Sequence, residues 1–172
     1  MGGRSARTLE VGKAAPAFKL SATNGKKYAL AEGLASGPLL VAFFKVSCPT
    51  CQFTFPFIER LHQQLRSACA DGARVWGISQ DNANYSGRFA KEFGVTFPIL
   101  IDEEPHEISQ EYGLNYVPTL FLISPDGQVE ITCDGFSKAG IEDIHRSLAK
   151  HSSVKPPALF KTADRVPEFK PG

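Results

Sequence analysis

The stretch that decides the fold is VAFFKVSCPTCQFTFPFIERL, residues 41–61 of the chain. Its start belongs to a continuous apolar run over residues 39–44, which is typical of a strand buried on both faces of a sheet. Its end has the apolar spacing of a helix. Cys48 and Cys51 stand three residues apart at this junction. Such a pair is compatible with a metal site, a structural disulfide, a peroxide-reducing thiol or a dithiol that exchanges electrons with other proteins.

The helix after the cysteine pair is predicted to bury one row of side chains. Apolar residues recur in this row at every fourth position, namely at Phe53, Phe57, Leu61 and Leu65. Cys69 continues the same spacing, so we expect it in the core. Cys133 lies in a later predicted strand, where either face of the sheet could hold it, and a second resolving role for it is the lesser alternative.

Length and composition indicate one globular domain. The chain has 172 residues, of which 42% are hydrophobic, enough to form a core. It carries 19 Lys and Arg against 18 Asp and Glu, a formal net charge of +1. This balance provides no electrostatic reason to expect nucleic acid or an acidic membrane as a partner. No apolar run approaches the roughly 20 residues that span a bilayer, so no membrane segment is expected.

The first residues, MGGRSARTLEVGKAAPAFKL, contain basic side chains but no apolar segment of the kind found in secretory signals. We therefore expect a cytoplasmic protein, with an extracytoplasmic location as the alternative if a leader has been removed. Four cysteines in a chain of this size do not make a disulfide scaffold. In a reducing compartment, a close cysteine pair favours catalysis or metal binding.

The periodicity of the whole chain predicts an α/β fold with a central mixed sheet flanked by helices. A hairpin over residues 18–30, in which Asn24-Gly25 supplies the positive φ angles of a tight turn, precedes the order β-α-β-α-β-α-β-β-α. We divide the chain into a flexible arm over residues 1–8, a domain over residues 9–150 and a Pro-containing C-terminal tail over residues 151–172. The sequence leaves the packing of this tail open.

A structural zinc site is not favoured, because it needs four ligands. Cys48 and Cys51 supply two, the other two cysteines are isolated, and the four histidines show no paired spacing. We expect neither a metal nor another cofactor.

A redox role fits the position of the pair better. At a strand-to-helix junction, the first sulfur lies by the helix N-terminus, where unpaired N–H groups and the helix dipole favour a thiolate. The thiolate is the attacking species in disulfide exchange. Cys48 is therefore the predicted nucleophile and Cys51, one turn inside the helix, the predicted resolving thiol. The Pro49-Thr50 spacer argues against two merely structural core cysteines, which is the alternative.

At this point the chain resembles the thioredoxin superfamily, in the redoxin branch that includes alkyl hydroperoxide reductase/thiol-specific antioxidant proteins and TlpA/ResA-type thiol–disulfide oxidoreductases. The resemblance runs from about Leu9 to about Lys150. It is carried by LLVAFFKVSCPTCQFTFPFIERL, by VWGISQD, by FAKEFGVTFPILID and by YGLNYVPTLFLISPDGQV with GFSK after it. The resemblance implies a thioredoxin-like fold with a β-α insertion at about residues 73–101.

The resemblance also implies roles for individual residues. Pro118 is expected to follow a cis peptide bond beside the dithiol, and the backbone of Val117 to pair with a substrate chain, next to Pro49 and Thr50. An ordinary trans proline that opens a strand is the alternative for Pro118.

The chain departs from thioredoxin at Ala42, which stands where thioredoxin has a buried acid. Asp81 falls where ResA-type proteins keep an acid near the active site, so it is a candidate acid/base helper. The alternative is a loop aspartate that caps the helix near Tyr85.

Three functions remain in competition. The first is a thiol–disulfide oxidoreductase that acts as a monomer on protein disulfides or dithiols and is served by an upstream thiol reductant. The second is a peroxiredoxin-like thiol peroxidase, but Val41 and Lys45 stand where that type has Pro and Thr, and its arginine is missing before residue 119. The third is a binding module in which the dithiol is incidental. We favour the first.

Overall fold

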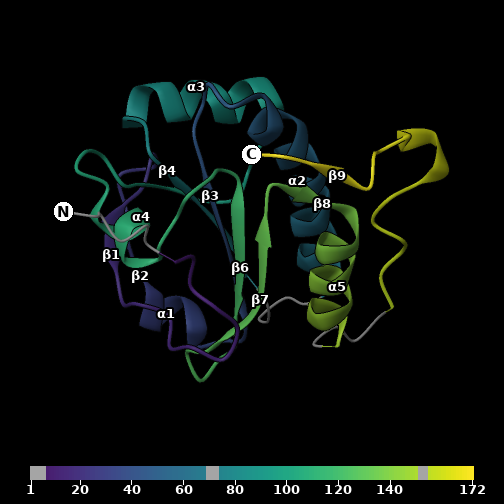
Figure 1. The fold of residues 1–172 in the computed structure, drawn as a ribbon, viewed down its shortest axis with the longest axis horizontal. Helices are drawn as coiled ribbons and strands as arrows, with labels where there is room; N and C mark the ends of the chain where they lie inside the picture. The colour runs from purple at the N-terminus through teal and green to yellow at the C-terminus, as the bar shows by residue number, and fades with distance from the viewer. Residues whose placement is uncertain (1–6, 69–73, 151–154) are drawn as a thin grey trace.

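The computed structural model describes residues 7–68, 74–150 and 155–172, and its core is a five-stranded sheet (Figure 1). The strands lie in the order β5-β4-β3-β6-β7. Their bounds are β3 Leu39–Phe44, β4 Arg74–Ser79, β5 Ile99–Ile101, β6 Thr119–Ile123 and β7 Val129–Asp134. Strands β3, β4 and β5 run parallel, whereas β6 is antiparallel to both β3 and β7. The predicted mixed sheet is confirmed.

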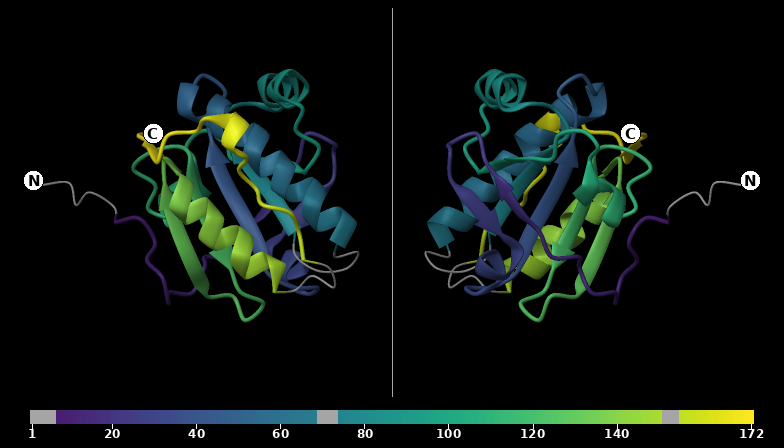
Figure 2. Two further views of the ribbon diagram at one scale, coloured as in Figure 1. Left: turned by 90° about the vertical axis from the view of Figure 1, so that its right-hand side faces the viewer. Right: turned by 90° about the vertical axis from the view of Figure 1, so that its left-hand side faces the viewer.

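The helices that connect these strands are α2 Pro49–Ala68, α3 Ala83–Phe93, α4 Glu107–Glu111 and α5 Lys138–Ala149. One face of the sheet carries α2, α3 and α5 over alternate residues of β3, namely Leu40, Ala42 and Phe44. The other face carries the hairpin of β1 (Lys19–Ser21) and β2 (Lys27–Ala29), with α1 (Leu30–Leu34) and Tyr112 after α4. Figure 2 shows these two layers on either side of the strands. Because all six residues of β3 are buried, this strand is apolar throughout.

The hairpin forms as expected, but its turn is not the tight turn with two positive φ angles that was predicted at Asn24-Gly25. Only Gly25 has a positive φ, at 79°, and Asn24 does not. The loop over residues 22–26 is longer than a two-residue turn, and the Asn24 side chain accepts a hydrogen bond from the Lys26 amide. The elements α1, β8 (Phe136–Ser137), η1 (Thr162–Asp164) and β9 (Phe169–Lys170) were not predicted.

The buried stripe of α2 differs from the predicted row. Leu61 and Leu65 are buried, but Phe53 and Phe57 are only half-buried. A strict four-residue row drifts around a helix of 3.6 residues per turn, so it cannot stay on the core side. The side chains that fill the core instead are Cys51, Phe55 and Ile58, followed by Leu61 and Leu65. Cys69 lies outside the described residues.

Local signals set the ends of two helices. The Asn82 side chain accepts a hydrogen bond from the Tyr85 amide and caps α3. Gly94 ends this helix with φ 69°. Ser137 caps α5 by accepting a hydrogen bond from the Gly140 amide.

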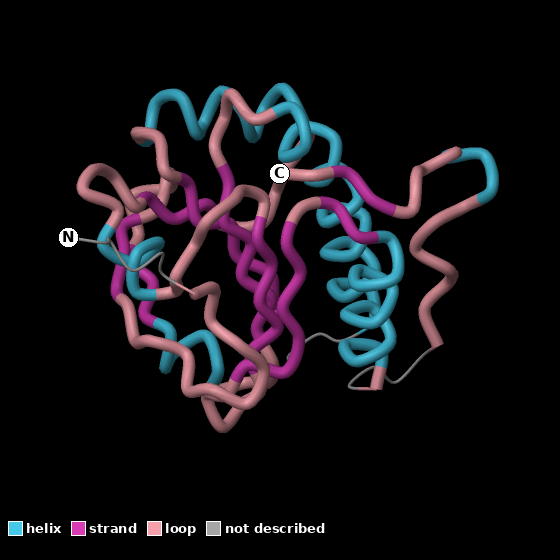
Figure 3. The backbone as a smooth tube through the Cα atoms, viewed as in Figure 1, coloured by secondary structure: helices cyan, strands magenta, loops and turns pink. Residues whose placement is uncertain are grey.

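Residues 155–172 pack against the domain and do not extend away from it. Figure 3 shows this segment mostly as loop, with η1 and β9 inside it. Strand β9 pairs antiparallel with β8. The segment therefore contributes to the neighbourhood of α2, a contact that the sequence left open.

Candidate active site

Cys48 is the N-cap residue of α2. The first helical hydrogen bond, from the Gln52 amide, is accepted by the Cys48 carbonyl at 3.0 Å. The Cys48 sulfur accepts the Cys51 amide at 3.2 Å, which is the bond that a capping side chain normally makes. An N–H group aimed at sulfur stabilises negative charge on it. Cys48 is half-buried, so its sulfur combines this stabilisation with access from solvent.

Cys51 has the opposite environment. Its side chain is fully buried among the residues between α2 and the sheet. Burial raises the pKa of the Cys51 thiol, and the hydrogen bond with Cys48 raises it further, while the backbone of Lys45 lowers it. Both cysteines are free thiols. The two sulfurs therefore differ in exposure although they stand one turn apart, and burial disfavours the thiolate form of Cys51.

The loop before β6 completes the site. The register of the antiparallel pair places Thr119 beside Phe43, near the end of β3. This pairing brings Val117 to the first turn of α2, where its carbonyl accepts the Cys48 thiol at 3.4 Å. The Val117–Pro118 bond is cis, as expected, and the Glu104–Pro105 bond is also cis, which was not expected. The Pro118 carbonyl is already used, because it accepts the Gly135 amide.

Two side chains hold the turn that carries Cys48. Asp81 accepts the Val46 amide at 2.8 Å. Gln52 donates to the Val46 carbonyl at 2.9 Å from one turn inside α2. Together they bind both backbone polar groups of Val46, which stands two residues before the nucleophile. The structure thus puts Asp81 next to the predicted site, but as a partner of the backbone.

Neither spacer residue contacts the sulfur through a hydrogen bond. Pro49 is exposed and opens α2, a position where the missing N–H has no cost. The Thr50 hydroxyl is buried and donates to the Pro171 carbonyl at 2.6 Å. Thr50 therefore contacts the chain's own tail at the place where a substrate chain was expected.

Comparison with known proteins agrees with this geometry. The profile of the AhpC/TSA family matches residues 11–132. The chain belongs to the AhpC/TSA family. It is 31% identical over 148 residues to the thiol–disulfide oxidoreductase ResA of Geobacillus thermodenitrificans, covering 86% of this chain and 80% of the relative.

Two solved structures have the same fold as this AhpC/TSA protein. One is a putative protein disulfide isomerase from Bacteroides thetaiotaomicron, with a TM-score of 0.75 at 23% identity, covering 85% of this chain and 92% of the other. The other is a putative thiol:disulfide interchange protein DsbE from Chlorobium tepidum, with a TM-score of 0.72 at 23% identity, covering 84% and 99%. The thioredoxin-like fold and the oxidoreductase class of this AhpC/TSA chain are confirmed.

The alternative role of Asp81 as the cap of the helix near Tyr85 is wrong in this AhpC/TSA protein, because Asn82 caps α3. Sequence reasoning also missed Gln52, whose role depends only on its place four residues after Cys48. No pattern in the sequence distinguishes that glutamine from an ordinary helical one.

Ala42 is fully buried in β3. The buried acid that thioredoxin has at this position is therefore replaced by an apolar side chain. In the part of the chain that the structure describes, no group of three or more His, Cys, Asp or Glu side chains could hold a metal ion. The described helices include none that is long and apolar enough to cross a membrane.

Proposed function

We propose that Cys48 and Cys51 carry the thiol–disulfide exchange of this AhpC/TSA protein, with Cys48 as the nucleophile and Cys51 as the resolving thiol. The observation that supports this assignment is the contrast between the two sulfurs. Cys48 is accessible and accepts an N–H bond at 3.2 Å, whereas Cys51 is fully buried behind it. Only the exposed sulfur can meet a disulfide on another protein.

The exchange takes two steps. The Cys48 thiolate attacks one sulfur of the substrate disulfide, forms a mixed disulfide and releases the other substrate sulfur as a thiolate. Cys51 then loses its proton and attacks the Cys48 sulfur, which closes the Cys48–Cys51 disulfide and releases the second substrate thiol. The substrate gains two electrons and the protein loses two, so an upstream thiol reductant must return the protein to its dithiol form. The reverse sequence would oxidise a substrate dithiol.

The neighbouring residues are assigned supporting roles. Val117 and Pro118 would position the substrate backbone beside the Cys48 sulfur, and Pro49 and Thr50 would line the same surface. Asp81 remains a candidate acid/base helper for Cys51, and its hydrogen bond to Val46 supports a positioning role as well. Both thiols come from one chain, which supports a monomer as the active form.

The reduction potential of the Cys48–Cys51 couple tests the direction of transfer. We would equilibrate the protein with defined thiol buffers, alkylate the free thiols and weigh the products by mass spectrometry. A potential near about −270 mV would identify a reductase suited to the cytoplasm, and one near about −120 mV would identify a disulfide donor suited to an extracytoplasmic location. Failure of Cys48 and Cys51 to form a disulfide with each other would contradict the assignment.

Peroxide reduction is the competing activity, and the site lacks the Pro and the Thr that a peroxiredoxin-like site has before its reactive cysteine. Val41 is apolar, and the Lys45 side chain that follows β3 is exposed. We therefore expect slow, non-saturating oxidation of Cys48 by hydrogen peroxide. Fast saturating turnover would reverse the ranking of the two activities.

A further inference from the structure

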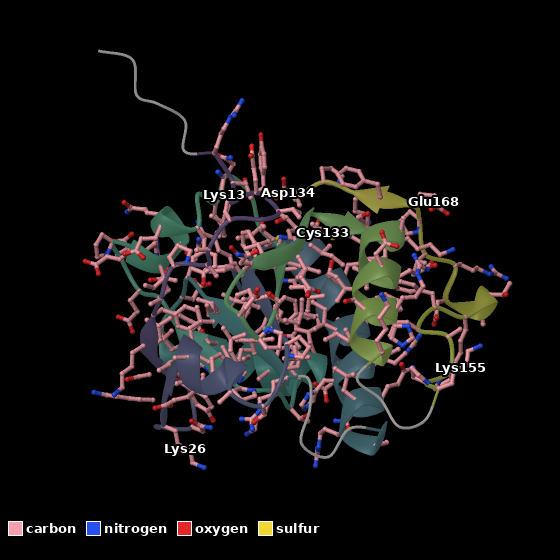
Figure 4. All side chains as sticks on the ribbon, turned by 90° about the horizontal axis from the view of Figure 1, so that it is seen from below. Lys13, Lys26, Cys133, Asp134, Lys155 and Glu168 are labelled. Atoms are coloured by element: carbon pink, nitrogen blue, oxygen red, sulfur yellow. The ribbon has the colours of Figure 1, made fainter. Side chains whose placement is uncertain are left out.

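The segment over residues 155–172, here called the tail, returns along α2 and α5 to the active site. Figure 2 shows it, in yellow, running beside these two helices and crossing toward the C label. In Figure 4, Lys155 lies at its start and Glu168 at the point where it approaches the beginning of α5. The tail has two parts that are held differently.

The first part is anchored to α2. Leu159 is buried in the main core. Arg60 donates to both oxygens of Asp164, at 2.7 and 3.1 Å, and to the Leu159 carbonyl at 2.8 Å. These bonds hold the pKa of Asp164 at about 2, so the pair stays ionised in mild acid. The Phe160 ring packs at 5.1 Å from the ring of Phe57. This part is fixed by burial and by a bidentate ion pair.

The second part, residues 168–172, is held by backbone bonds and by two surface side-chain contacts, the Lys138–Glu168 ion pair at 3.9 Å and Lys170 at 4.8 Å from the Phe53 ring centre. The Lys138 amide donates to the Glu168 carbonyl at 2.9 Å. Phe169 pairs with Ser137 and Lys170 with Phe136, as an added antiparallel strand. The Phe169 side chain is 57% exposed, so little apolar burial secures this strand. Backbone pairing at a short edge strand is easily exchanged for pairing with another chain.

The end of the tail lies on the groups that a substrate should meet. Thr50, in the Cys-x-x-Cys spacer, donates to the Pro171 carbonyl. A Cβ atom added to Gly172 would overlap the Val117 carbonyl and would lie 3.2 Å from the Tyr116 Cβ. This same Val117 carbonyl accepts the Cys48 thiol. Glycine is therefore the residue that allows the tail to approach the carbonyl beside the nucleophile.

We propose that residues 168–172 occupy the place of a substrate chain, so that a protein substrate must displace them before it can bind beside Cys48. This inference rests on the proposed function for the identity of the site. It also specifies the substrate class, because the surface is filled by an extended backbone that adds a strand to β8. A flexible, extended polypeptide segment carrying a disulfide can form the same pairing, whereas a rigid globular surface cannot.

The tail is covalently attached, so it competes at a high effective concentration even if its intrinsic affinity is low. Release requires the short strand, the Lys138–Glu168 ion pair, the contact of Lys170 with the Phe53 ring and the Thr50 contact to break. The anchor at Leu159 and Asp164 can remain in place. The arrangement thus lowers the reactivity of Cys48 toward small oxidants without closing the site to polypeptides that bind better.

The first experiment deletes residues 168–172 and keeps the anchored part of the tail. We measure the second-order rate of Cys48 alkylation by iodoacetamide, and the rate of insulin disulfide reduction with dithiothreitol as reductant. Both rates should rise by at least about threefold in the shortened chain. Unchanged rates in a chain that melts at the same temperature would overturn the proposal.

A matched pair of glycine substitutions tests the same idea in the full chain. Gly172→Ala adds one methyl group where the Val117 carbonyl stands, so it should loosen the tail and raise the alkylation rate. Gly87→Ala adds the same group where nothing lies within 4 Å, and it should leave the rate unchanged. Equal rates in both variants would contradict the close contact.

A binding experiment separates this inference from the proposed redox activity. The synthetic peptide RVPEFKPG, residues 165–172, is titrated into the shortened chain carrying Cys48→Ala and Cys51→Ala, which has no thiol chemistry at the site. Saturable binding, absent with a scrambled peptide, supports occupancy of the site, and no binding at millimolar peptide overturns it. The peptide could bind even though no chain with intact cysteines reduces insulin. That outcome would refute the proposed function but support the occupancy of the site by the tail.

Discussion

Cysteines lie at the start of α2 and near the end of β7, but the two places differ in how far they expose the sulfur and in whether they favour its thiolate form. At α2, Cys48 is half-buried and its sulfur accepts the Cys51 amide. At β7, Cys133 is buried opposite Leu120 and against α5, where a Cβ atom on Gly140 would overlap its sulfur. Burial raises the pKa of Cys133 to about 12, and the carboxylates of Asp134 and Asp143 add to the effect.

The two cysteines have the same side chain, so the difference between them lies in their surroundings in the fold. Cys133 is surrounded by close packing and by negative charge, both of which disfavour a thiolate. Cys48 lies at the end of α2 where amides are unpaired. Cys133 lies in the same buried cluster as Cys51 and packs against Gly140 of α5, and its second resolving role stays a prediction.

The largest effect should come from removing the nucleophile. Cys48→Ala should lower insulin disulfide reduction by at least about a hundredfold. Cys133→Ala is the matched control and should retain the rate of the unaltered protein. A comparable loss in the control would erase the distinction between the two regions.

Removing the resolving thiol should separate the two steps of exchange. Cys51→Ser keeps the Cys48 sulfur and its helix terminus, so the first attack should proceed while the mixed disulfide persists. Non-reducing electrophoresis after mixing with oxidised substrate should show a covalent complex that reductant dissolves. Absence of this complex, with Cys48 still open to alkylation, would place the resolving group elsewhere.

The second step should also depend strongly on pH. Because burial raises the pKa of Cys51, its thiolate fraction grows with pH, and resolution of the mixed disulfide should accelerate by about tenfold per unit in the neutral range. Stopped-flow mixing at several pH values measures this rate. A rate independent of pH would mean that proton loss from Cys51 does not limit the step.

Substitutions at Asp81 should have an intermediate effect and should distinguish its two roles. Asp81→Ala leaves the Val46 amide without its acceptor, which should cost about 1–3 kcal/mol in the free energy of unfolding and slow exchange several-fold. Asp81→Asn still offers an oxygen to that amide. If exchange is as slow in Asn as in Ala while stability recovers, the carboxylate acts in acid/base chemistry; recovery of both indicates positioning.

The last prediction lies outside the neutral range and concerns stability in alkali. The folded protein keeps Cys133 protonated up to about pH 12, whereas the unfolded chain loses that proton near the ordinary value of 9.0. The unfolded state therefore binds fewer protons above pH 9, and stability should fall between pH 9 and 12. Cys133→Ala, at a cost of about 1 kcal/mol for the lost sulfur, should show a shallower fall by chemical denaturation. An identical slope would contradict the environment assigned to Cys133.

Much of the fold could be predicted because its signals are local. The apolar run of β3, the caps at Ser137 and Gly94, and the turn between β6 and β7 all depend on neighbouring residues. The prediction of one buried row on α2 was wrong at its start. A strict four-residue spacing leaves the side of the helix that faces the core, and Phe53 and Phe57 are therefore only half-buried. The path of the tail stayed open for another reason, since its backbone pairing carries no side-chain signature.

The sequence by itself determined the cysteine pair, its position at the start of a helix and the choice of Cys48 as the outer sulfur. These follow from three to four consecutive peptide units and the geometry of one helix turn. Only the tertiary structure decided what surrounds that sulfur. The Asp81, Val117 and Pro171 contacts join residues 35, 69 and 121 positions apart. Such pairings depend on how the sheet orders its strands and how the tail returns, and no local pattern encodes those distances.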